Sequence, residues 1–161
     1  MVKRTPLTQD PCPIARSLDQ IGDWWTLLIV RNALHGARRF GEFRKELGVS
    51  KSMLSTRLAQ MVEHGILEQR PDPNGSAYGE YHLTEKGRQL WMVLVALRQW
   101  GEANLFQTGE AMTVLQDRRN GSPTRRLALM AADGQVLQQA DTDVRLGVAD
   151  IGPRSESEKE F

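Results

Sequence analysis

A run of small polar side chains on one predicted helix is the part of this sequence best suited to binding another molecule. The stretch GVSKSMLSTRLAQMVEHG occupies positions 48–65. Its apolar residues have the spacing of one helical stripe and are Leu54, Leu58, Met61 and Val62. The remaining positions carry hydroxyl, amide and basic groups, with no acid before Glu63, and are Ser50, Lys51, Ser52, Ser55, Thr56, Arg57 and Gln60. Such a face predicts contact with a partner that offers neutral hydrogen-bonding groups and negative charge.

Double-stranded DNA is a partner of that kind. A helix fits the major groove, where base edges present neutral donors and acceptors, and phosphates line both rims of the groove. We therefore expect Ser52, Thr56 and Gln60 to contact bases. The basic residues expected to hold phosphates are Lys51, Arg57, Arg38 and Arg39.

These assignments have structural alternatives. The helix could be an ordinary amphipathic helix with one solvated face, and Arg38 and Arg39 could be plain surface charge. Arg57 could be a partner of Glu42 or Glu46 instead of a phosphate contact.

The segments around this helix form a recognisable order. Helices are predicted over 13–22, 23–36 and 38–48, each with a glycine at its end, and Ser50 is a good N-cap for the next one. Strand-like runs at 66–70 and 78–84 flank an Asn-Gly turn and predict a β-hairpin. A long helix, 85–106, follows. This is the order of a winged helix-turn-helix: helix, short turn, helix, hairpin and helix. The hairpin residues expected to contact DNA are Arg70, Asn74 and Ser76.

Composition limits the class of protein. The chain has 161 residues, 40% hydrophobic, and a net charge of +1, so a general excess of positive charge does not mark it as a nucleic-acid binder. The positive charge is local, with six Lys or Arg against two Glu between 38 and 57. A single cysteine, Cys12, excludes an intrachain disulfide. The first residues lack the apolar core of a signal peptide, and no apolar run approaches the ~18 residues of a membrane span, so we expect a cytoplasmic protein.

Enzymatic chemistry has no support in the sequence. It contains no phosphate-binding glycine loop and no nucleophile elbow, and its three histidines have no metal-ligand spacing with each other or with Cys12. We expect no enzyme activity, no metal and no cofactor. The alternative function is a winged-helix module that binds proteins without binding DNA.

Five motifs, taken together, resemble the HxlR family of bacterial transcriptional regulators over residues 12–106. They are the Cys-Pro start at Cys12, WTLLI at 25–29, GARRFGEF at 36–43, the S-x-x-x-L-S-x-R-L pattern at 50–58 and Y-x-L-T-x-K-G-R at 81–88. The resemblance implies a homodimer that binds inverted-repeat operators, as a repressor or activator of a nearby operon. It also implies no enzymatic activity.

The resemblance gives Cys12 a candidate role. In some members of the family the cysteine of this Cys-Pro start senses oxidants or electrophiles. Lys3, Arg4, Arg16 and the start of the helix at Pro13 would favour a thiolate here. The structural alternative is a small buried hydrophobic residue.

We expect an α+β, mainly helical fold, in which a winged helix-turn-helix domain carries a small β-rich C-terminal extension. The predicted domains are 1–107 for DNA binding and dimerisation and 108–161 for the extension, with a polar tail at its end. Helix 85–106 carries more apolar surface than a small domain usually buries, which predicts a homodimer. The extension could lengthen the dimer contact, cover the long helix or enclose a small-molecule effector.

Overall fold

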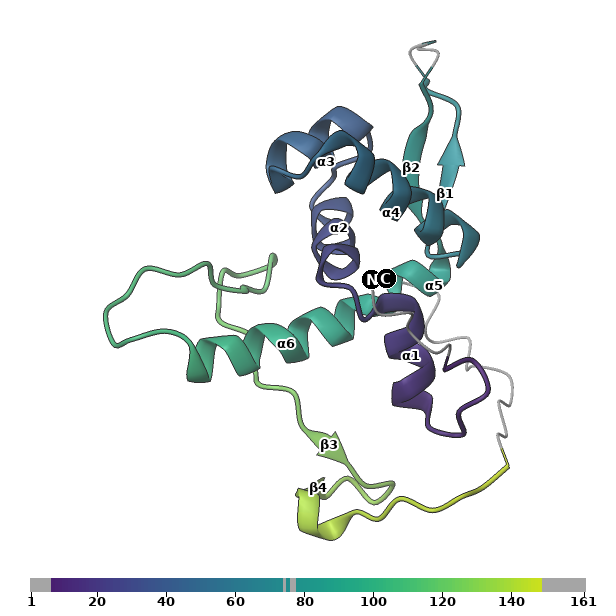
Figure 1. The fold of residues 1–161 in the computed structure, drawn as a ribbon. Coiled ribbons are helices and arrows are strands. Elements are labelled where there is room, and N and C mark those ends of the chain that lie inside the picture. Colours follow the sequence, from purple (N-terminus) through teal and green to yellow (C-terminus); the bar gives the residue numbers. More distant parts are fainter. Residues whose placement is uncertain (1–6, 74, 76–77, 149–161) are drawn as a thin grey trace. The chain divides into compact units, whose positions relative to one another are not determined.

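From the first helix to the wing, the order of elements is the one that the sequence predicts. The computed structural model describes residues 7–73, 75 and 78–148. Its elements are α1 (Pro13–Ile21), α2 (Trp24–Leu34), α3 (Phe40–Leu47), α4 (Lys51–Glu63), β1 (Leu67–Arg70), β2 (Glu80–Leu83), α5 (Glu85–Arg88), α6 (Leu90–Asn104), β3 (Leu129–Met130), β4 (Val136–Leu137) and a 3₁₀ turn, Gln139–Asp141 (Figure 1). The predicted fold class, a helical winged domain with a small β-containing extension, is confirmed.

Helices α2 and α4 begin at side-chain caps. Asp23 accepts a hydrogen bond from the Trp25 amide at 2.9 Å and starts α2. Ser50 accepts one from the Met53 amide at 3.3 Å and starts α4, as predicted. Gly48 ends α3 in a left-handed conformation (φ 64°), which lets the chain turn into α4 within three residues. The tight helix-turn-helix therefore follows from local sequence signals.

Helix α2 lies at the centre of the core, as its apolar sequence predicts. Its Ile29 and Val30 are buried together with Phe43 of α3 and with Leu54 and Leu58 of α4. Because α4 buries its inner stripe against α2 and α3, its opposite face is turned away from the protein.

Strands β1 and β2 form an antiparallel hairpin beside α4, the wing of the fold (Figure 1). The register pairs Leu67 with Leu83 at the base of the wing and Arg70 with Glu80 further out. The Tyr81 amide donates to the Arg38 carbonyl at 2.8 Å, which joins the wing to the segment before α3. The predicted tip contacts Asn74 and Ser76 lie outside the described residues.

The single helix expected over 85–106 is wrong in detail. The chain forms two helices that meet at Gln89, and α6 ends at Asn104. Helix α5 packs against both β2 and α2, and α6 continues along α2. In the described part of the chain no helix is long and apolar enough to cross a membrane.

The segment after α6 is less regular than the sequence predicts. Its described residues up to 127 contain one isolated bridge, between Gln116 and Pro123, and they return along α6. The Leu127 amide donates to the Gln99 side chain at 2.9 Å, and Arg98 donates to the Thr113 carbonyl at 2.7 Å. The first compact unit accordingly runs to Leu127. The second unit, from Ala128, contains the β3–β4 hairpin, whose turn includes Gly134 (φ 85°). Independent folding of residues 1–107 stays a prediction.

Candidate nucleic-acid interface

The exposed face of α4 carries the polar residues that the sequence singles out. Lys51, Ser52, Ser55 and Thr56 are all exposed. The hydroxyl oxygen of Ser52 lies 3.4 Å from that of Ser50. Within the described residues, Lys51, Ser55 and Thr56 form no side-chain hydrogen bond or ion pair, so their polar groups are available to a partner molecule.

Ala59 belongs to the same face and was missed by the sequence reasoning, which searched for donors and acceptors. It is exposed, one helical turn beyond Ser55. A methyl group at this place in a groove can contact the thymine methyl. The i, i+3, i+4 spacing that identifies the polar face would also have included Ala59.

Gln60 and Arg57 lie on the flank of α4 and are only partly exposed. The Gln60 side-chain oxygen is buried and has no hydrogen-bond partner in the described structure. An Arg57 guanidinium nitrogen lies 2.8 Å from an Asp23 carboxylate oxygen. The expectation that Arg57 would pair with Glu42 or Glu46, if it had a structural partner, was wrong because its flank faces the start of α2.

Arg38 and Arg39 lie just before α3 and both make contacts within the protein. Arg38 donates to the carbonyls of Ala33 and Ala37, the latter at 2.8 Å, and so stabilises the end of α2. Arg39 pairs with the buried carboxylate of Asp72 at 2.9 Å, although 46% of its side chain remains exposed. Arg39 thus keeps surface that a phosphate can reach, whereas Arg38 is committed to backbone carbonyls.

Glu42 fixes the same segment. Its carboxylate accepts the amide hydrogens of Arg38 at 2.7 Å and Arg39 at 2.9 Å. These two hydrogen bonds, with the positive charges nearby, hold the pKa of Glu42 below its ordinary value. The ionised Glu42 therefore caps α3 by accepting both amide hydrogens.

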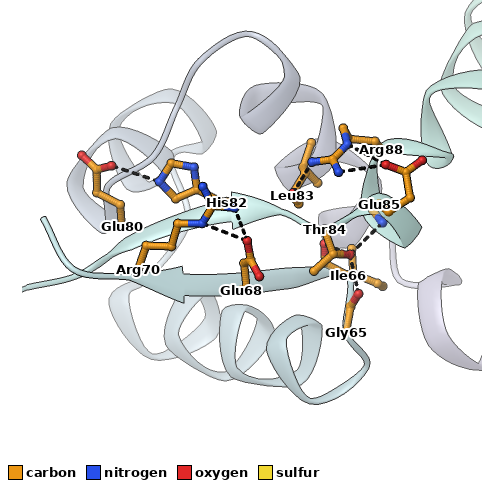
Figure 2. A network of polar contacts seen from close by, with 11 residues as sticks. Gly65, Ile66, Glu68, Arg70, Glu80, His82, Leu83, Thr84, Glu85 and Arg88 are labelled. Atoms are coloured by element: carbon orange, nitrogen blue, oxygen red, sulfur yellow. Dashed lines mark hydrogen bonds and ion pairs between the residues drawn. The ribbon is translucent and has the colours of Figure 1, made fainter. Parts of the chain in front are cut away.

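The wing is internally paired along its length (Figure 2). Arg70 donates to Glu68 at 2.9 Å, and His82 lies 3.1 Å from Glu80. At the base, the Thr84 hydroxyl donates to the carbonyls of Gly65 at 2.6 Å and Ile66 at 3.2 Å. The Arg70 charge, the expected wing contact, is thus partly neutralised by a neighbouring acid.

Three other features bear on function. Cys12 is exposed, and its amide donates to Asp10 at 2.8 Å, so the alternative of a buried hydrophobic cysteine is wrong for this chain. A cavity of about 270 Å³ lies between α2, α6 and the returning segment, with Leu28, Arg31 and Met112 among its lining residues. Several large apolar side chains of α6 are exposed, namely Trp91, Met92, Val93, Leu97 and Trp100.

Known proteins resemble this chain in sequence and in structure. The uncharacterised HTH-type transcriptional regulator Rv3095 of Mycobacterium tuberculosis is 42% identical over 92 residues, which are 57% of this chain and 58% of that protein. The chain thus matches less than two thirds of that relative's length.

Two solved structures extend the comparison. PA1607, a candidate transcription factor, is 48% identical, with a TM-score of 0.84 over 88% of this chain and 99% of its own. The oxidised form of the redox regulator HypR is 31% identical, with a TM-score of 0.54 over 60% of this chain and 100% of its own.

The family model described as HxlR-like helix-turn-helix matches residues 20–108. That range covers more than half of the chain and contains α2, α3, α4, the wing and α6. It also includes the exposed polar face of α4. The protein therefore belongs to the HxlR family of winged helix-turn-helix, DNA-binding transcriptional regulators.

Proposed function

We propose that this protein binds an inverted-repeat operator as a homodimer and represses or activates a nearby operon. The observation that carries the proposal is the exposed face of α4, where Ser52, Ser55, Thr56 and Ala59 lie outward with Lys51 at the edge. Such a face matches base edges between two rows of phosphates.

The residues of the proposed DNA-binding surface fall into two groups, those that contact bases and those that contact phosphates. Ser52, Thr56 and Ala59 occupy the centre of the exposed face and are proposed to contact bases. Lys51 lies at the edge of this face with an exposed charge, and Arg39, just before α3, keeps 46% of its side chain exposed; both are proposed to contact phosphates. Because phosphate contacts release counterions while base contacts distinguish sequences, the two groups should respond differently to salt and to mutation of the operator.

The test begins with selection of bound sites from genomic DNA, followed by affinity measurements on the selected operator. Thr56→Ala should change the preference at particular base pairs and cost ~1–3 kcal/mol where a good contact is lost. Lys51→Ala should weaken binding to all sequences alike and lower the salt slope by ~1. If neither variant alters affinity or preference, α4 is not the recognition element.

Dimerisation is supported by the apolar surface of α6. Trp91, Leu97 and Trp100 are 39%, 51% and 58% exposed, and side chains of this size are normally covered. A symmetric dimer would place two α4 helices on successive turns of DNA, so half-site centres should lie about 34–36 Å or a multiple apart. Light scattering should give twice the chain mass at micromolar concentration, and Trp100→Lys should shift the protein toward monomer. A wild type that is monomeric throughout would contradict this part of the proposal.

Regulation through Cys12 is a further element of the proposal. Its support is the exposed thiol and the likeness to HypR, which is described as a redox regulator. With one cysteine in each chain, reversible oxidation must give an intersubunit disulfide, a mixed disulfide with a small thiol, or a sulfenic acid. Any of these would change the surface at the start of α1.

The alternative, a winged-helix module that binds only proteins, is separated by a simple measurement. A DNA-binding protein should be retained on DNA-cellulose at low salt and released as salt rises. A module that binds only proteins should not be retained on the DNA-cellulose, even though its α4 is exposed in the same way.

A further inference from the structure

Arg57 lies in an unexpected position for a phosphate contact. Its side chain is 21% exposed and leans toward α2, and its guanidinium lies 2.8 Å from Asp23, which is itself 28% exposed. The Nε atom of Arg57 is buried and has no partner among the described residues. Arg57 is therefore held against α2 by the middle of α4, away from the exposed face.

The Asp23 carboxylate acts on two helices at once. One oxygen accepts the Trp25 amide at 2.9 Å and caps α2, while the other lies against Arg57. This carboxylate therefore ties the middle of α4 to α2, the central helix of the core.

Charge gives a reason why Arg57 would not leave Asp23 for a phosphate. If it did, the partly buried Asp23 carboxylate would remain without its cation. Removing one partner of such a pair is usually unfavourable because the other charge stays desolvated and unpaired.

We propose that Arg57 is a positioning residue: through Asp23 it sets the angle at which α4 enters the groove, and it holds no phosphate. This inference rests on the proposed function, since it assigns a role within the same DNA-binding surface. It reassigns a residue that the sequence alone places among the phosphate contacts.

The two roles of Arg57 predict opposite results for Asp23→Asn. Asparagine caps helices as well as aspartate, so α2 keeps its N-cap while the ion pair loses its charge. If Arg57 positions α4, Asp23→Asn should weaken binding to the selected operator about tenfold, roughly the loss of one base contact. If Arg57 holds a phosphate, the same substitution frees its charge and should strengthen binding.

The salt dependence of Arg57→Gln gives a second, independent readout. A lost phosphate contact lowers the salt slope by ~1, whereas a lost positioning residue leaves the slope unchanged and reduces the preference for operator over random DNA. Lys51→Ala is the matched control, because Lys51 lies on the same helix, is exposed and has no partner within the described residues. We expect Lys51→Ala to lower the slope and Arg57→Gln to keep it.

The double variant completes the experiment. Asp23→Asn and Arg57→Gln break the same ion pair, so the double variant should weaken operator binding no more than either single variant. As a control for folding, each variant must keep the unfolding transition of the wild type. The inference is overturned if Arg57→Gln lowers the salt slope, if Asp23→Asn tightens operator binding, or if operator preference is unchanged. A wild type without any sequence preference would overturn the proposed function as well, which separates the two failures.

Discussion

Replacing Gly87 by alanine should destabilise the base of the wing. Gly87 lies in the first turn of α5, and its amide donates to the Thr84 hydroxyl at 3.1 Å. A Cβ atom added there would lie 2.2 Å from the Ile66 carbonyl oxygen and 2.9 Å from a Leu83 methyl group. The backbone carbonyl cannot rotate away as a flexible side chain could, so α5 must move.

The size of the effect follows from that geometry. An ordinary carbon–oxygen contact needs roughly 1 Å more space, and overpacking of this kind typically costs ~1–3 kcal/mol. The same Ile66 carbonyl accepts hydrogen bonds from the Thr84 amide at 3.1 Å and from its hydroxyl at 3.2 Å (Figure 2). Stretching these bonds adds about 1 kcal/mol, while the better helix propensity of alanine returns a similar amount. We expect a net loss of about 1–3 kcal/mol, or a fall in Tm of roughly 3–18 °C for the unit that ends at Leu127.

Thermal unfolding followed by circular dichroism measures this, with Gly41→Ala as the matched control. Gly41 also lies in the first turn of a helix, but an added Cβ there meets no atom within 4 Å. The control should be neutral or more stable by up to about 1 kcal/mol. If Gly87→Ala unfolds at the wild-type temperature or above, the close approach of α5 to Ile66 does not exist in solution.

Three further predictions concern the α3 cap, the domain boundary and the thiol. Glu42→Ala should cost about 1 kcal/mol at pH 7 as a lost cap. Because the folded pKa of Glu42 is lowered from its ordinary value of 4.5, the difference from wild type in denaturant unfolding should shrink as pH falls below that value. A chain ending at Leu127 should unfold like the full chain, whereas one ending at Gln107 should be less stable, since it uncovers α6. Diamide should change operator binding of wild type reversibly and leave Cys12→Ser unaffected; equal responses would exclude thiol sensing.

The helix-turn-helix and the wing could be predicted from the sequence because their signals are local. Asp23, Ser50 and Thr84 cap helices through their own side chains, and Gly48 ends α3 because glycine adopts a left-handed conformation without strain. The apolar stripe of α4 likewise determined which face is exposed. The motif set was sufficient to indicate the family.

The roles of individual cations depended on the tertiary structure. Nothing in the local sequence distinguishes Arg57 from Lys51, which are six residues apart on one helix. The fold brings Asp23 against one of them and leaves the other exposed. Likewise Asp72 meets Arg39 only because the wing returns beside α3. Such pairs join residues that are distant in the chain, and local sequence patterns do not reveal them. The sequence could therefore determine which helix faces a partner, but only the packed structure decided which charges on that helix remain available to the partner.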